Sequence, residues 1–174
     1  MRITVRKLTF MAVLTSVALI VFIIEAQIPL PVPIPCAKLG LANTVTLFAL
    51  FYSTGKQRAT DSFTTADALM ILACRIILGA VFTGRIVAFI YSIVGGLLGF
   101  AAQAALKRFV TNKQIWACGA VGAIFHNIGQ ILAAMIVTGT PSIIAYLPLL
   151  IIAGTITGTV TGLAAQYTLT RIER

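Results

Sequence analysis

The stretch Leu8-Thr-Phe-Met-Ala-Val-Leu-Thr-Ser-Val-Ala-Leu-Ile-Val-Phe-Ile-Ile-Glu25 decides the fold class, because it carries no charge before its last residue. A helix that crosses the hydrocarbon core of a membrane needs roughly 20 residues of this kind. The run is longer than the apolar core of a signal peptide, and no small-x-small cleavage site stands between it and the prolines that follow. We therefore expect it to form the first transmembrane helix.

The composition of the whole chain agrees with this interpretation. The 174 residues are 59% hydrophobic and 10% charged, with a mean hydropathy of +1.03, whereas soluble domains carry about 25% charged residues. We expect one all-α integral membrane domain over residues 1–174, a six-transmembrane-helix bundle. Charged residues, prolines and glycines separate the apolar runs and predict helices over 8–25, 36–53, 64–83, 86–106, 114–138 and 147–167.

The second of these helices has the weakest support. The part that follows Gly40 is too short to cross a membrane alone. The helix must therefore begin within the stretch Pro35–Lys38, or neighbouring helices must shield part of it.

Basic residues predict the orientation. The net charge of +9 is spread between the apolar runs, so membrane topology explains it better than nucleic-acid binding does. With the N-terminus inside, only Lys38 and Arg85 belong to outer loops. Both termini are then cytoplasmic, and that side holds Arg2, Arg6, Lys7, Lys56, Arg58, Lys107, Arg108, Lys113, Arg171 and Arg174.

Three polar residues of the fifth helix, His126, Asn127 and Gln130, are candidates for a site. Residues three and four apart share a helix face, and polar groups within a membrane usually face the bundle interior. They can bond across helices or contact a ligand, and their clustering favours a ligand.

Arg75 lies near the middle of the third helix and stays charged. Asp67 is the only acid on that helix, about 12 Å away by helical rise, and Thr64-x-x-Asp67 is typical of a capping box. Arg75 therefore needs another partner, and helix-end carbonyls and an anion fit equally well.

A proline-rich loop, Gln27–Pro35, lies between Glu25 and Lys38. These two residues can pair and fix its ends. Alternatively, Lys38 and Asn43 face a ligand at the outer mouth. We expect one positive cavity in the outer half, beneath the loop, suited to an anionic or carbonyl-rich and partly apolar solute. Its predicted substrate-binding residues are Lys38, Asn43, Arg75, His126, Asn127 and Gln130.

The sequence offers no catalytic or metal-binding constellation. Its four acids form no pair suited to acid–base chemistry, its three cysteines lack metal-ligand spacing, and there is one histidine. We therefore expect a protein that is not an enzyme and that uses no metal or cofactor.

Small residues at four-residue spacing predict close helix packing. The pattern runs through Gly154, Gly158 and Gly162, and again through Gly95 and Gly99. A further small pair, Ala12-x-x-x-Ser16, can serve internal packing or a helix of a partner protein.

Several ordered motifs resemble a bacterial membrane family known as the "Gx transporter family" or "heptaprenyl diphosphate synthase component I". This family is similar to the substrate-binding S components of energy-coupling-factor (ECF) importers. The motifs are Ile28-Pro, Lys38-Leu-Gly-Leu-Ala-Asn43, Arg75-Ile-Ile-Leu-Gly79, Tyr91-Ser-Ile-Val-Gly-Gly96, His126-Asn-Ile-Gly-Gln130, and Tyr146-Leu-Pro followed by Gly154-x-x-x-Gly158.

The resemblance implies an S-component-like bundle in the bacterial cytoplasmic membrane, with a pocket for a small organic solute in its outer half. Its partners would be an ECF transmembrane coupling subunit and ATPase subunits. S components typically dock through an Ala-x-x-x-Ala motif in the first helix, and Ala12-x-x-x-Ser16 departs from it by one conservative replacement, which puts the docking role of this pair in question.

The synthase label implies a different function, a non-transporting membrane subunit associated with isoprenoid, quinone or flavin-linked redox metabolism. Prenyl diphosphate synthases hold Mg²⁺ with Asp-Asp-x-x-Asp segments. No two acids here stand closer in sequence than Asp61 and Asp67.

Overall fold

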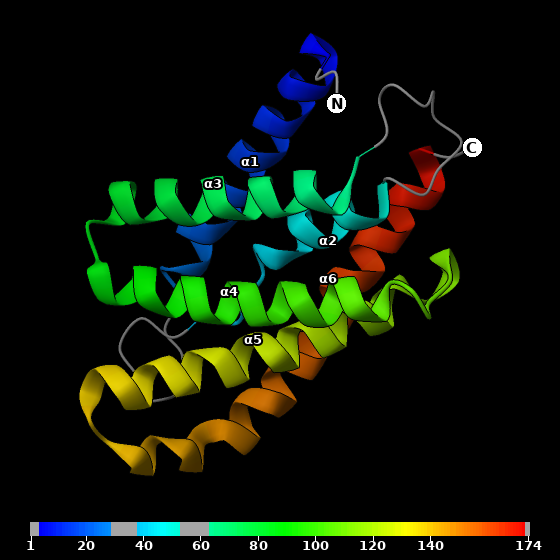
Figure 1. Ribbon diagram of the computed structural model, residues 1–174. Helices are drawn as coiled ribbons and strands as arrows, with labels where there is room; N and C mark the ends of the chain where they lie inside the picture. The colour runs from blue at the N-terminus through cyan, green and yellow to red at the C-terminus, as the bar shows by residue number, and fades with distance from the viewer. Residues whose placement is uncertain (1–3, 29–37, 53–62, 173–174) are drawn as a thin grey trace.

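The computed structural model describes residues 4–28, 38–52 and 63–172. In this part of the chain all regular structure is helical (Figure 1). The elements are α1 (Val5–Glu25), α2 (Asn43–Tyr52), α3 (Thr65–Thr83), α4 (Ile86–Leu106), the 3₁₀ turn η1 (Asn112–Gln114), α5 (Ile115–Thr138), the 3₁₀ turn η2 (Pro141–Tyr146) and α6 (Leu147–Ile172).

Five helices, α1, α3, α4, α5 and α6, are long and apolar enough to cross a membrane. Most of their bounds lie within three residues of the predicted runs, whereas α6 continues to Ile172, five residues past the predicted end at 167. Thr64 caps α3, and Gly84 and Gly139 end α3 and α5 in the left-handed conformation. The structure thus supports a multi-pass helical membrane protein.

Helix α2 departs from the predicted second crossing of residues 36–53. It begins at Asn43 and has ten residues, a length of about 15 Å, or half the hydrocarbon thickness. Lys38–Ala42 are not helical, and residues 36 and 37 lie outside the described residues. The correction has a physical reason: α2 contacts all five long helices, so they shield a helix that is too short to span.

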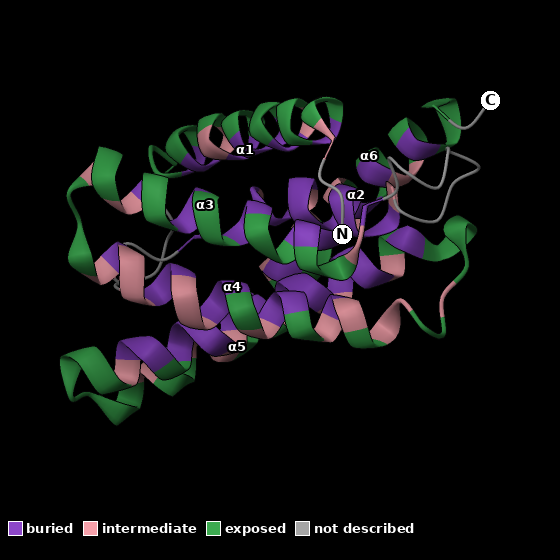
Figure 2. Cartoon of the chain, turned by 45° about the horizontal axis from the view of Figure 1, so that its top comes forward, coloured by how far each residue is buried: buried purple, intermediate pink, exposed green. Residues whose placement is uncertain are grey.

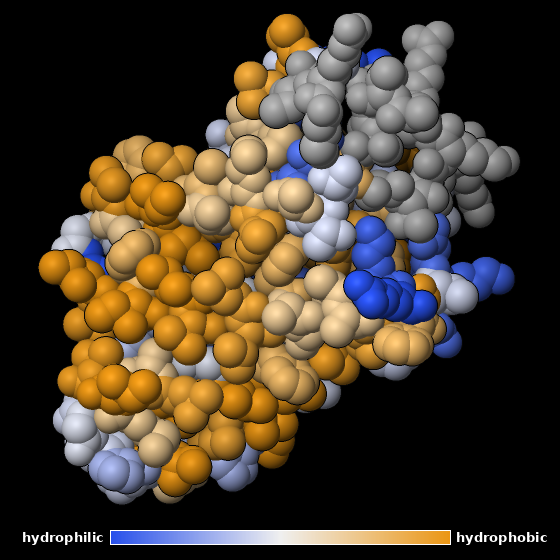
Figure 3. All heavy atoms as spheres, viewed as in Figure 1, coloured by the Kyte–Doolittle hydropathy of each residue, from blue (hydrophilic) through white to orange (hydrophobic). Residues whose placement is uncertain are grey.

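Burial confirms that α2 is central. Most of its residues are buried, including Leu47, Leu50 and Phe51, and Figure 2 shows it in purple among partly exposed helices. The long helices turn apolar side chains outward, as at Val81, Ile136 and others, and Figure 3 shows this hydrophobic surface. Such a surface is suited to lipid contact.

Helices α4, α5 and α6 pack through glycines. A Cβ on Gly99 would lie 2.8 Å from the carbonyl oxygen of Gly122 on α5. On the other side of α5, a Cβ on Gly158 would lie 2.6 Å from the carbonyl oxygen of Gly119. These backbone contacts confirm the packing role predicted for the four-residue spacing.

The start of α3 is fixed to the start of α1. Asp67 completes a capping box, accepting from the backbone N of Thr64 at 2.6 Å, as its spacing predicts. The same carboxylate forms a buried ion pair with Lys7, with Nζ and Oδ2 2.6 Å apart. One acid therefore caps α3 and binds α1.

Replacing Asp67 with asparagine keeps an oxygen for the cap but removes the charge that faces Lys7. We expect a loss of about 2 kcal/mol in the free energy of unfolding. This is less than the roughly 3–5 kcal/mol for a fully buried pair, because a lysine near a helix end can extend toward the membrane interface. Denaturation in mixed micelles measures the effect. The double variant Lys7→Met/Asp67→Asn should lose less free energy of unfolding than the two single variants lose together. Strictly additive losses would contradict the pairing.

Candidate functional site

Buried polar side chains from five of the six helices and the segment before α2 meet inside the bundle. We call six of them the polar cluster: Glu25, Lys38, Asn43, Arg75, His126 and Gln130, each at most 8% exposed. Arg75 and His126 lie near the middle of α3 and α5. Tyr91 and Ser92 of α4 line the same small cavity.

The cluster surrounds the non-helical segment Lys38–Ala42, which lies inside the bundle directly before α2. The Gln130 amide brackets Lys38, because its Oε1 accepts from the Lys38 backbone N at 2.9 Å and its Nε2 donates to the Lys38 carbonyl at 2.9 Å. The Glu25 carboxylate accepts from the backbone N of Gly40 at 2.5 Å and of Leu41 at 3.2 Å. Glu25, the last residue of α1, therefore holds the segment through the backbone of Gly40 and Leu41.

Gly40 lets this segment lie against the histidine ring. Its φ is +82°, a region that L side chains rarely adopt. A Cβ there would lie 2.9 Å from Cδ2 of His126 and 3.1 Å from Nδ2 of Asn43. The glycine of Lys38-Leu-Gly-Leu-Ala-Asn43 is thus required by both conformation and space.

Arg75 is 3% exposed and donates from Nη2 to Oδ1 of Asn43 at 2.9 Å. One turn along α3, Gly79 leaves room for the Phe22 ring, which a Cβ would overlap. Nζ of Lys38 lies 3.1 Å from the centroid of that ring, a cation–π contact. The spacing Arg75-x-x-x-Gly79 therefore positions both cations of the cluster. Arg75 is one of them, and Gly79 makes room for the Phe22 ring that contacts the other, Lys38.

His126 is neutral in this arrangement. The Lys38 backbone fixes the orientation of the Gln130 amide, so its Nε2 is a donor. That nitrogen lies 2.5 Å from Nε2 of His126, and an amide nitrogen cannot accept. Nε2 of the imidazole must therefore accept and carries no proton. On the other side, Gly95 lets α4 approach, since a Cβ there would lie 2.9 Å from the His126 carbonyl oxygen.

Asn127 is the one predicted site residue that the structure does not bring to the cluster. Its Nδ2 donates to the Leu150 carbonyl of α6 at 2.6 Å, and Gly154 leaves space for the amide. Asn127 follows His126 directly, and adjacent residues point about 100° apart on a helix. Its contacts are those of a residue that joins α5 to α6.

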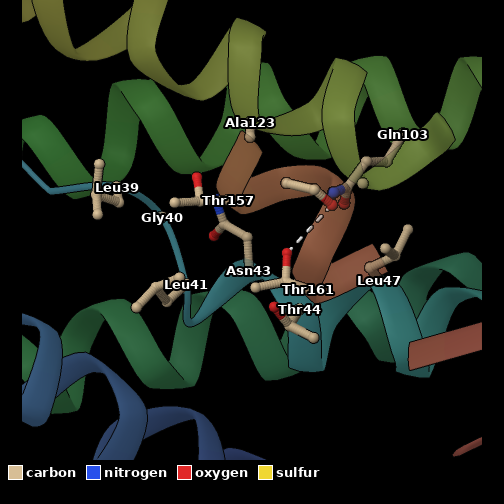
Figure 4. Close-up of a pocket in the computed structure, with 12 residues that line it drawn as sticks. Leu39, Gly40, Leu41, Asn43, Thr44, Leu47, Gln103, Ala123, Thr157 and Thr161 are labelled. Carbon is tan, nitrogen blue, oxygen red and sulfur yellow. Dashed lines mark hydrogen bonds between the residues drawn. The ribbon is translucent and has the colours of Figure 1, made fainter. Parts of the chain in front are cut away.

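Two small cavities lie on either side of the segment Lys38–Ala42. One is lined by the polar cluster with Phe22, Tyr91 and Ser92. The other lies between α2, α5 and α6, and Figure 4 shows Asn43, Gln103 and Thr161 around it. Each has a volume of about 10 Å³, near the room one water needs. Residues of the segment line both cavities, so an organic solute needs the segment to move.

Phe22, Tyr91 and Ser92 are residues that sequence reasoning did not assign to the site. Tyr91 and Ser92 precede the Gly95-Gly96 pair by one helical turn, and that spacing is the signal that marks them. Phe22 stands in an uninterrupted apolar run and carries no such signal. Within the described residues, no group of three His, Cys, Asp or Glu side chains is arranged to hold a metal ion.

Comparison with known proteins gives one family. Neither the curated proteins nor the solved structures gave a match. A sequence model described as heptaprenyl diphosphate synthase component I matches residues 14–168. The matched region runs from α1 into α6 and includes every member of the polar cluster. The chain therefore belongs to the heptaprenyl diphosphate synthase component I family.

Proposed function

We propose that this protein is the substrate-binding S component of an ECF-type importer and that it binds a small organic solute at the polar cluster, in the outer half of the bundle. The chain itself catalyses no reaction, and ATP hydrolysis is supplied by partner subunits. The observation that carries the proposal is the cluster itself: two cations, a carboxylate, an imidazole and two amides gathered inside a membrane protein around a non-helical segment. Such groups are costly in a bilayer and mark binding sites and pathways.

The way the segment is held suits a site that opens. Glu25 and Gln130 bind it through four hydrogen bonds to the backbone of Lys38, Gly40 and Leu41. These bonds join polar groups that a ligand can also bind, so a solute can replace part of what it displaces. In the proposed mechanism the segment Lys38–Ala42 moves out of the cluster to admit the solute and closes again over it.

The surface of α1 supports docking on a membrane partner. Ala12 and Ser16 are both exposed, so neither serves packing within the described bundle. The Ser16 hydroxyl donates to the Ala12 carbonyl at 3.0 Å, which satisfies it in lipid and leaves two small side chains on this face of α1. Small residues let a second helix approach closely. We assign this small-residue face to the ECF transmembrane coupling subunit.

The distribution of charge supports the proposed orientation, with both termini in the cytoplasm of a bacterial cell. The chain ends of α1 and α6 and the α4–α5 connection lie at one end of the bundle (Figure 1). Figure 3 shows hydrophilic surface at that end, and its described basic residues are Arg6, Lys7, Lys107, Arg108, Lys113 and Arg171. The cytoplasmic side of a membrane protein carries such an excess.

Co-expression with a shared ECF coupling subunit and its ATPases tests the proposal. We expect the wild-type chain to co-purify with this module and to support ATP-dependent solute uptake. Ser16→Leu places a bulky side chain on the small-residue face of α1 and should abolish co-purification. Thr155→Leu, at an exposed position of α6, should leave co-purification unchanged. Failure of the wild type to co-purify, where a known S component does, would overturn the docking proposal.

The family description favours a second candidate, a non-transporting membrane subunit associated with isoprenoid, quinone or flavin-linked redox metabolism. Of the described acids, Asp67 is bound to Lys7 and Glu25 to the segment backbone. Neither is placed to bind Mg²⁺ and diphosphate, so such a subunit would support a separate catalytic chain. Loss of quinone synthesis without any loss of solute uptake on deletion of the gene would favour this candidate.

A further inference from the structure

The charges of the polar cluster do not cancel. Lys38 and Arg75 are cations, Glu25 is the one acid of the cluster, and the hydrogen bond from Gln130 makes His126 neutral. All of these side chains are buried. The cluster therefore carries a surplus of one positive charge in a region of low dielectric constant.

Among the described residues, no other acid lies at the cluster. The chain has four acids, and Asp67 is bound to Lys7 at the start of α3. Asp61 and Glu173 lie outside the described residues, next in sequence to the start of α3 and the end of α6. Residues 29–37, which lead into the cluster, contain no acidic residue. The described part of the chain therefore offers no second negative charge to neutralise the surplus.

The geometry around Arg75 indicates which kind of anion fits. Its Nη2 binds Asn43, while its Nε has no hydrogen-bond acceptor among the described residues. A guanidinium presents its donors as a planar fork that matches a carboxylate or a phosphate. Of the two, the carboxylate carries the single negative charge that balances the cluster, whereas a phosphate monoester carries nearly two. The rings of Phe22 and Tyr91 line the same cavity and suit an apolar body attached to that carboxylate.

We propose that the solute is a monocarboxylate with an apolar body, whose single negative charge neutralises the cluster and whose carboxylate binds Arg75 beside Lys38. This inference rests on the proposed function. A neutral solute would leave the surplus positive charge of the cluster uncompensated. A cationic solute would raise the net charge to two positive charges, and a dianion would turn it into one negative charge. Each alternative is costly where water is excluded.

Matched probes test the charge directly. The purified chain, in nanodiscs of zwitterionic lipid, is titrated with benzoate, benzamide and benzylamine, and with hexanoate and hexanamide, while the unfolding temperature is recorded. We expect both carboxylates to raise the unfolding temperature and the amides and the amine to leave it unchanged. The proposal is overturned if an amide or the amine stabilises the chain as much as the matching carboxylate does. It is also overturned if neither carboxylate stabilises the chain.

Variants locate the effect. Lys38→Met keeps the aliphatic stem beside Phe22 and removes one charge, so the apparent affinity for benzoate should fall by about 30-fold or more. Arg75→Met removes the other cation of the cluster and should lower the apparent affinity for benzoate to a similar extent. Arg85→Gln removes a cation from an exposed position before α4 and should leave benzoate binding unchanged. An equal loss in Arg85→Gln would assign the binding to general surface charge and overturn the proposal.

The two proposals fail in different ways. If the ECF module imports a neutral or cationic solute through this chain, the proposed function stands and the monocarboxylate is wrong. If carboxylates stabilise the chain through Lys38 and Arg75 but no import occurs with the module, the site stands and the transport function is wrong.

Discussion

Replacing Glu25 with glutamine is expected to lower the free energy of unfolding of the ligand-free protein by about 3 kcal/mol. Glutamine keeps an oxygen that accepts from the backbone N of Gly40 and Leu41, so the hydrogen bonds to the segment are preserved. What is lost is the one negative charge beside Lys38 and Arg75. The surplus in the cluster rises from one positive charge to two, and both cations are buried.

The matched variant is Arg75→Met, which removes a cation in place of the anion. It costs the hydrogen bond from the charged guanidinium to Asn43, about 1.5 kcal/mol, but it also brings the net charge of the cluster to zero. Unfolding in mixed micelles compares the two. The Glu25→Gln variant should be clearly less stable than the Arg75→Met variant. Equal losses in the free energy of unfolding would contradict a surplus of one positive charge in the cluster.

A valine at Gly158 is expected to destabilise the bundle by about 3 kcal/mol or more, at the upper end for overpacking. A Cβ at this position would lie 2.6 Å from the Gly119 carbonyl oxygen and 2.9 Å from Cα of Ala120. These are backbone atoms of α5, so no rotation of a side chain relieves the overlap. The two helices would have to separate over their most extensive contact.

Ala164→Val is the control, because Ala164 lies on the same helix at an exposed position. It adds methyl groups of the same kind where lipid can accommodate them. We expect a change below about 0.5 kcal/mol for a surface position away from packing contacts. A comparable loss in the two variants would show that valine disturbs α6 itself and would contradict the packing explanation.

The long helices could be predicted to within a few residues because their limits are local. Thr64 and Asp67 form the capping box that their spacing indicates, and Gly84 ends α3 where the apolar run stops. Helix α2 could not be predicted in this way. Its length makes sense only when five neighbours surround it, and that is a property of the tertiary structure.

The site was predictable where helical spacing determines it. His126 and Gln130 are four residues apart and do share a face, whereas Asn127 points to α6. The partners were harder to predict. Gln130 binds the backbone of Lys38, 92 residues earlier in the chain, and no local pattern encodes such a contact. For Arg75 the sequence left carbonyls and an anion open, and the partner that the structure shows is the Asn43 amide.

The most direct test of the central claim is native mass spectrometry of the protein purified gently from its membrane. We expect the wild type and Arg85→Gln to retain a small organic molecule and Arg75→Met to lose it. A wild type without any bound small molecule, or an Arg75→Met variant that retains it equally well, would contradict the claim that the polar cluster is a solute-binding site.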